Sequence, residues 1–146
     1  MVEDIKQFCK DFSNKLFEQT TFQEVSGYTK ITMPHLDPYN DFLEIYVQRG
    51  DVGHFIISDD GYVFQYVFTL ISDIEIQKLI ITILTCFEIQ RQDDVLIIHA
   101  RDEDVGQMIN RMITAIMAIN ALGFCTIALG YKIPESHPTC LPQGGF

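Results

Sequence analysis

Apolar residues recur at helical spacing in three stretches of the chain. In the first stretch most of them lie three or four residues apart, which gathers them on one side of a helix. These residues are Ile5, Phe8, Cys9, Phe12 and Leu16. The second stretch begins at Ser72-Asp-Ile-Glu75, which has the form of a capping box. In the third stretch the apolar positions nearly encircle the helix. The sequence therefore predicts three main helices, at about residues 3–19, 73–87 and 103–122. We expect the first to cover one side of the core and the third to be deeply buried, with Gly123 as its C-cap.

Alternating apolar and polar residues predict strands between these helices. We expect an antiparallel β-meander at about residues 28–58, whose first strand ends at Pro34, and a second hairpin at about 88–99. Val63–Leu70 fits either a strand or a short helix, and we favour the helix. The order of elements predicts an α+β domain of two layers, with the strands packed against the three helices.

Chain length and composition fit one folded domain. A chain of 146 residues lies within the usual range of about 100–200 residues per domain, and we expect that domain at residues 1–133. Three prolines and a Gly-Gly pair predict a flexible tail at 134–146. The absence of long apolar or repetitive runs excludes a collagen, a coiled coil and a membrane span.

Charge and cysteine content narrow the setting and the partners. Twenty acidic and ten basic residues give a net charge of −10, and the cations never form a run. Because phosphate contacts need clustered cations, we expect no direct nucleic-acid binding, whereas an acidic surface would suit a basic partner. The N-terminus mixes charged and apolar residues and thus lacks the pattern of a secretory signal. We therefore expect a cytoplasmic protein, without membrane contact, whose four scattered cysteines are reduced.

Two passages carry an ordered set of motifs, Asp37-Pro-Tyr-Asn-Asp-Phe-Leu-Glu-Ile-Tyr-Val47 and Ile56-Ile-Ser-Asp-Asp-Gly-Tyr62. Their D-x-x-N-D loop, I-Y-V strand and S-D-D-G turn, followed by a helix, two strands and a closing helix, resemble the domain-of-unknown-function 1828 family of bacteria and their phages. The resemblance covers about residues 25–122, although Val63–Leu70 is more aromatic than the family pattern. It implies a phage or mobile-element setting, such as regulation or host-defence conflict. It implies no established reaction, cofactor or catalytic residue.

Four aspartates form the one candidate chemical site, at Asp37, Asp41, Asp59 and Asp60. Asp41 opens one predicted strand and Asp59-Asp60 closes its hairpin partner, so the acids can approach one another. Such carboxylates bind Mg²⁺ or Mn²⁺ and would serve a metal-dependent hydrolase. Asp before Gly also forms turns by accepting hydrogen bonds from its own backbone, and Tyr46 stands where a D…E-x-K nuclease needs its lysine. We therefore favour the turn role, predict no catalytic residue and no cofactor, and keep the metal site as the alternative.

The sequence thus favours a non-enzymatic function. We expect a small acidic cytosolic protein that binds another macromolecule, its partner being an unidentified protein. A mean hydropathy of +0.12 also predicts self-association through an apolar patch, most simply as a two-fold homodimer. Two alternatives remain open, the metal-dependent hydrolase at the aspartates and a small-molecule sensor that uses the aromatic segment Tyr62–Phe68.

Overall fold

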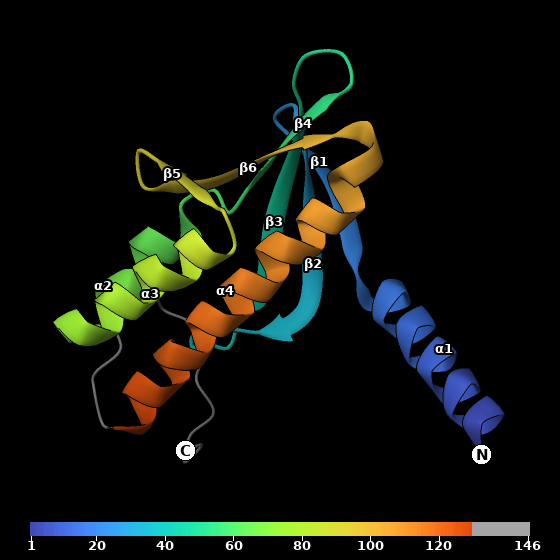
Figure 1. The fold of residues 1–146 in the computed structure, drawn as a ribbon, viewed down its shortest axis with the longest axis horizontal. Helices are drawn as coiled ribbons and strands as arrows, with labels where there is room; N and C mark the ends of the chain where they lie inside the picture. The colour runs from blue at the N-terminus through green and yellow to red at the C-terminus, as the bar shows by residue number, and fades with distance from the viewer. Residues whose placement is uncertain (130–146) are drawn as a thin grey trace.

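The computed structural model describes residues 1–129, which form a six-stranded antiparallel sheet with helices packed on one face (Figure 1). The sheet order is β1-β2-β3-β4-β6-β5, with β1 at Thr21–Val25, β2 at Tyr28–Leu36, β3 at Phe42–Arg49, β4 at His54–Ser58, β5 at Gln90–Gln92 and β6 at Val95–Arg101. The longer helices are α1 at Val2–Gln19, α3 at Ile74–Cys86 and α4 at Val105–Ala128. Shorter turns are the π-helix η1 at Val63–Val67, α2 at Phe68–Leu70 and the 3-10 helix η2 at Asp102–Asp104. The α+β class and the three main helices are confirmed, and the predicted tail lies outside the described residues.

The predicted meander and hairpin belong to a single sheet. Strand β6 pairs with β4, placing Ile57 opposite Ile98, and both side chains are buried. A first strand, β1, went unpredicted. It joins β2 through Ser26-Gly27, whose φ angles of 48° and 89° suit the two-residue turn of a hairpin. The prediction that Pro34 ends its strand is wrong, because β2 continues to Leu36 through an irregularity in its pairing with β3, the kind of place where a sheet accepts proline.

Helix α4 crosses the sheet and supplies the centre of the core (Figure 1). Met112, Ile116 and Ile119 are fully buried there against the inward side chains of the sheet. By length and composition alone the segment Asp102–Ala128 is apolar enough to cross a membrane. Its burial in this core is the ordinary alternative explanation for such a composition.

Two predicted helix caps differ from those observed. Asp73, not Ser72, is the N-cap of α3, and its carboxylate accepts hydrogen bonds from the backbone N–H groups of the two residues that follow Ile74. Gly123 is not a C-cap, since α4 continues to Ala128. A Cβ at Gly123 would lie 2.7 Å from Pro38 Cγ, so glycine stands there because helix and loop approach closely.

Helix α1 forms as predicted but does not cover the core. None of its residues is buried, and it extends away from the sheet (Figure 1). The reason lies at its end, where Thr20 has extended backbone angles and leads directly into β1. This short connection fixes the helix beyond the edge of the sheet, while α4 occupies the inner face.

Candidate functional site

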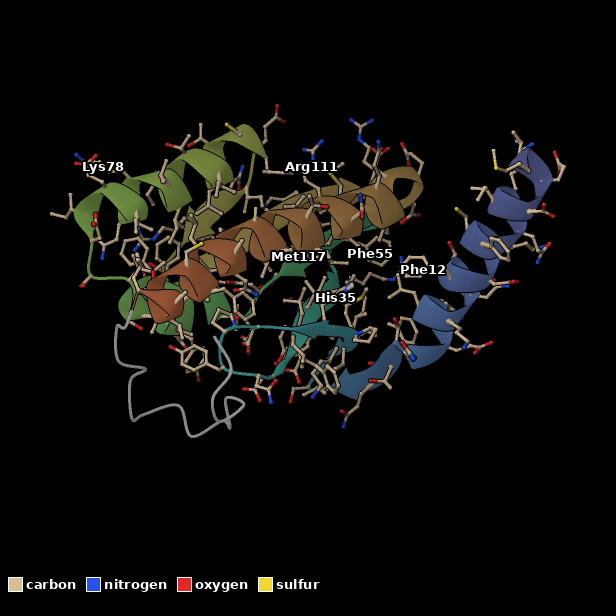
Figure 2. The ribbon with its side chains drawn as sticks, turned by 90° about the horizontal axis from the view of Figure 1, so that it is seen from below. Phe12, His35, Phe55, Lys78, Arg111 and Met117 are labelled. Carbon is tan, nitrogen blue, oxygen red and sulfur yellow. The ribbon has the colours of Figure 1, made fainter. Side chains whose placement is uncertain are left out.

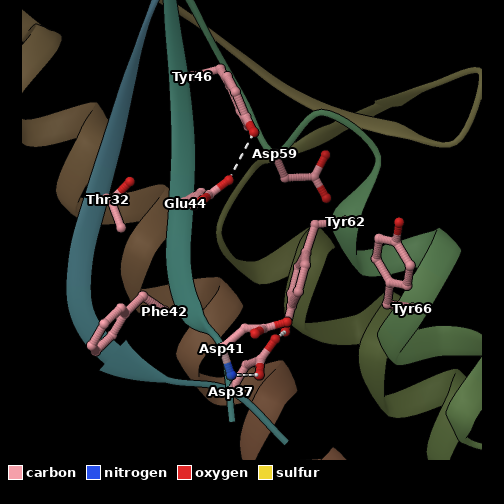
Figure 3. Close-up of a pocket in the computed structure, with 9 residues that line it drawn as sticks. All are labelled: Thr32, Asp37, Asp41, Phe42, Glu44, Tyr46, Asp59, Tyr62 and Tyr66. Atoms are coloured by element: carbon pink, nitrogen blue, oxygen red, sulfur yellow. Dashed lines mark hydrogen bonds between the residues drawn. The ribbon is translucent and has the colours of Figure 1, made fainter. Parts of the chain in front are cut away.

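A hollow of about 420 Å³ opens on the sheet face opposite α4, beside the π-helix. Strands β2 and β3 form one wall, and the loops that carry the predicted aspartates form the other (Figure 3). The lining residues are Thr32, Asp37, Asp41, Phe42, Glu44, Tyr46, Asp59, Tyr62 and Tyr66. The structure thus brings three of the four predicted aspartates to one place, and Asp60 does not line it.

Asp37 organises the loop between β2 and β3. Its Oδ1 accepts hydrogen bonds from the backbone N–H groups of Tyr39 and Asp41, at 2.9 and 2.8 Å. Its Oδ2 accepts a third from the Tyr62 hydroxyl, at 2.7 Å. Because Asp37 is only 2% exposed, these bonds replace the water that its carboxylate would otherwise keep.

Asp59 has the same kind of role in the turn after β4. It is 1% exposed and accepts from the backbone N–H groups of Gly61, Val63 and Leu96 at 2.8–2.9 Å. The carboxylate therefore ties the turn, the start of the π-helix and strand β6 together. Burial raises its pKa from the ordinary value of 3.8, and the three N–H donors oppose that rise.

Asp60 is exposed and is not one of the residues that line the hollow. Its own backbone N–H donates to Ser58 Oγ at 2.9 Å, and its φ of 52° is one that aspartate tolerates better than most side chains. The turn role predicted for Asp59-Asp60-Gly61 agrees with this geometry.

Glu44 and Tyr46 add a pair that the sequence did not single out. Both project from β3 into the hollow, and the Tyr46 hydroxyl donates to Glu44 Oε2 at 3.0 Å (Figure 3). Lys30 of the neighbouring strand lies 3.7 Å from the other carboxylate oxygen of Glu44. Alternation along β3 already indicated that these two share the face opposite Leu43 and Ile45. What it did not reveal is that this face meets the aspartate loops.

Three tyrosines in or beside the hollow, Tyr39, Tyr46 and Tyr62, are held in their neutral form. Burial, reinforced by the hydrogen bond to Glu44, raises the pKa of Tyr46. Burial and the charge of Asp37 raise the pKa of Tyr62, whose hydroxyl also lies 3.0 Å from Asn120 Oδ1 of α4. Tyr39, whose hydroxyl donates to the carbonyl oxygen of Tyr66 at 2.8 Å, has its pKa raised to about 12, chiefly by burial. These hydroxyls thus act as hydrogen-bonding groups at neutral pH and not as bases.

The chemistry available in the hollow is recognition of positive charge. Carboxylates from two loops and one strand face it together with tyrosine rings, and this combination attracts cations both electrostatically and through the ring faces. Within residues 1–129, no three His, Cys, Asp or Glu side chains are grouped so that they could hold a metal ion. The Mg²⁺ or Mn²⁺ alternative stays a prediction without further support.

The predicted aromatic segment Tyr62–Phe68 divides between the hollow and the core. Tyr62 and Tyr66 line the hollow, whereas Phe64 is buried with the guanidinium of Arg91 3.7 Å from its ring centre. This division follows ordinary helical spacing, because Tyr62 and Tyr66 are four residues apart and therefore share one side of the segment. The opposite side is buried, so the helix predicted at Val63–Leu70 accounts for the division.

Comparison with known proteins places the chain in a family without adding an activity. No curated protein and no solved structure matches it. A family model matches residues 33–119, which is more than half of the chain and takes in the hollow's aspartates, β3 and most of α4. The resemblance stated from the two motif passages is therefore confirmed, and the chain belongs to the family described as "Domain of unknown function DUF1828".

Proposed function

We propose that this protein acts by binding another protein, without catalysis, and that its hollow receives a basic side chain of that partner. One observation carries the proposal. The carboxylates of Asp37, Asp41, Glu44 and Asp59 border the same hollow as three tyrosine rings.

A lysine or arginine side chain fits this environment in both charge and shape. Glu44 contacts the Tyr46 hydroxyl and the Lys30 ammonium, but 41% of its side chain is exposed, so its oxygens have lone pairs left for a cation at the mouth of the hollow. The rings of Tyr46, Tyr62 and Tyr66 supply apolar walls and negatively polarised faces for the cation. The net charge of −10 would speed the approach of a basic partner over distances of about 10 Å in physiological salt.

The hydrogen bonds of the two buried aspartates support the non-catalytic part of the proposal. A general base or a metal ligand needs an oxygen lone pair directed at its substrate or ion. Asp37 and Asp59 each accept three hydrogen bonds from their own chain, so their oxygens are committed to holding the loops. The setting we propose is the cytosol, in the regulation or defence conflicts of phages and other mobile elements.

The test is capture of partners by the full chain and by a pair of matched variants. Glu44→Gln removes one charge from the hollow, and Glu103→Gln removes one from the exposed turn η2. We expect the wild type and Glu103→Gln to retain the same basic protein from a bacterial lysate, and Glu44→Gln to retain at least tenfold less. Equal capture by all three would refute the assignment to the hollow, and capture of nothing by the wild type would count against the function itself.

A small-molecule sensor is the second candidate, since the hollow's volume of about 420 Å³ lies in the range of ligand pockets, roughly 300–1,000 Å³. The same side chains favour a small amine or guanidine as ligand. A thermal-shift screen would separate the two functions, because a sensor is stabilised by a low-molecular-weight cation. If the hollow binds a protein, the cation alone should raise the melting temperature little.

A further inference from the structure

We infer that α1 joins two copies of this chain, its apolar stripe packing antiparallel against the same stripe of a second copy. The stripe runs along the helix, and within the single chain its residues are not buried. Five large apolar side chains on or next to this side of α1 are 53–94% exposed, at Met1, Val2, Ile5, Phe8 and Phe12. Elsewhere in residues 1–129 side chains of this size mostly lie in the core, so α1 is the largest unpaired apolar element in the described chain.

The area involved suits a stable dimer. An 18-residue helix is about 27 Å long. Five such side chains expose on the order of 100 Å² each, or about 500 Å² per copy. A reciprocal pair therefore buries about 1,000 Å², which is the size that a specific interface needs to reach.

The apolar surface also continues from α1 into the domain. Phe17 contacts Phe22 of β1, with ring centres 6.0 Å apart, and Phe22 borders a hollow on the helix-covered face that also involves Phe55 and Ile109. Phe12 lies on the side of α1 turned toward this part of the domain (Figure 2). In an antiparallel pair, the first turn of the second copy's α1 comes to lie at the level of this end of the helix, where it would extend the interface toward the domain.

Charge favours the antiparallel direction. At 3.6 residues per turn, Asp4 and Lys15 fall on the same flank of the stripe. An antiparallel pair centred midway between them sets Asp4 against the second copy's Lys15 on this flank. A parallel pair would separate Asp4 from that lysine by about 16 Å along the axis and bring two bodies of net charge −10 side by side.

The oligomeric state of purified full-length protein tests the inference. All four cysteines are changed to serine so that oxidation of Cys9 does not mimic association. We expect sedimentation to give twice the chain mass of 16.8 kDa for this parent and for the control Asn14→Glu, whose residue lies on the polar side of α1. Phe12→Glu and Ile5→Glu, which place a charge in the stripe, should each weaken the dimer at least 100-fold and leave the circular dichroism of the domain unchanged.

Cross-linking tests the direction of the pair. We expect a mixture of Asp4→Cys and Lys15→Cys variants to form a disulfide dimer faster than either variant alone. A monomeric parent, or a dimer that survives both glutamate substitutions, overturns the inference, and faster cross-linking of Asp4→Cys with itself overturns the antiparallel arrangement. Because these changes leave the hollow intact, partner capture by the monomeric variants is measured separately from dimer formation.

Discussion

Replacing Asp59 with asparagine tests the claim that this acid serves the backbone. The two side chains have nearly the same shape, so the change mainly substitutes an NH₂ group for one carboxylate oxygen. Oδ1 accepts from Gly61 and Leu96, and Oδ2 accepts from Val63. If the asparagine oxygen keeps the first two bonds, its NH₂ group must face the N–H of Val63, donor against donor.

The expected cost follows from these contacts. One buried backbone N–H loses its acceptor, and one buried NH₂ group has none, at about 1–3 kcal/mol each. We therefore expect Asp59→Asn to lower the free energy of unfolding by about 2–5 kcal/mol. Asp59→Ala leaves all three N–H groups without an acceptor, at about 3 kcal/mol or more, which is a large part of the 5–15 kcal/mol that stabilises a typical domain.

Urea unfolding followed by circular dichroism measures the effect, and the adjacent Asp60→Asn is its control. That variant makes the same chemical change at an exposed residue whose backbone N–H, and not its carboxylate, makes the turn's hydrogen bond. We expect it to change stability by less than about 0.5 kcal/mol. An Asp59→Asn protein as stable as Asp60→Asn would refute the structural role of Asp59 and revive a chemical one.

The pH dependence of the same pair gives a second test. Burial raises the pKa of Asp59 above its ordinary value of 3.8, so the folded chain binds this proton more tightly than the unfolded chain does. Its contribution to stability is therefore greatest below that ordinary value and falls as pH rises through the raised folded pKa. The wild type should gain stability relative to Asp59→Asn as pH is lowered through this range, and a loss would mean that the three N–H donors outweigh burial.

Three further changes probe the surrounding structure. Gly123→Ala should destabilise the domain by about 1–3 kcal/mol through its clash with Pro38, whereas Gly106→Ala in the open first turn of the same helix should stabilise it by up to about 1 kcal/mol. Thermal melts of the two variants would show shifts of opposite sign. Tyr62→Phe should cost about 1–3 kcal/mol in urea unfolding, because a buried carboxylate loses its hydroxyl donor. The pKa of Tyr39 is raised to about 12, so between about pH 10 and 12 only the unfolded chain ionises this group. The free energy of unfolding should therefore fall over this range. Unfolding curves at several pH values, beside an absorbance titration of the tyrosines, would measure the fall.

Local patterns were sufficient to predict most of the strands and helices. The meander predicted at about 28–58 ends with β4 at Ser58, because alternation and flanking glycines act within a few residues. The turn of the hairpin predicted at about 88–99 is equally local. Asp93 and Asp94 have φ angles of 50° and 66°, and aspartate adopts such angles at small cost because its short side chain can bond nearby backbone.

Local sequence patterns could not predict the contacts between segments that are far apart along the chain. Pairing of β4 with β6 joins residues about 40 apart, and it is decided by how well whole strands bury each other's faces. The same limit applies to α1. Its stripe correctly predicts a helix with one apolar side, but amphipathicity does not tell what covers that side, and in the single chain nothing in the described core does.

The hollow shows the limit most clearly. The aspartates were interpreted first as turn residues, from the Asn and Gly beside them, and as a metal site only in the alternative, so their surroundings on the sheet were not considered. Glu44 was considered only as part of a nuclease motif that Tyr46 breaks. In the structure the same Tyr46 donates to Glu44, and the pair faces the aspartate loops. The residues that make this place acidic and aromatic come from elements that only the completed sheet brings together.

Tyr62 links this surface to the core and helps to fix the form of the hollow. Its hydroxyl reaches Asp37 of the β2–β3 loop and lies near Asn120 of α4, while its ring forms part of the wall. The loop, the π-helix and the core helix are therefore held by one side chain, and the wall opposite Glu44 cannot move without breaking buried hydrogen bonds. If the hollow binds a cation as we propose, a site held in this way loses little conformational entropy on binding. In that function, charged groups at the mouth would provide the affinity, and the buried aspartates beneath would provide the rigidity on which that affinity depends.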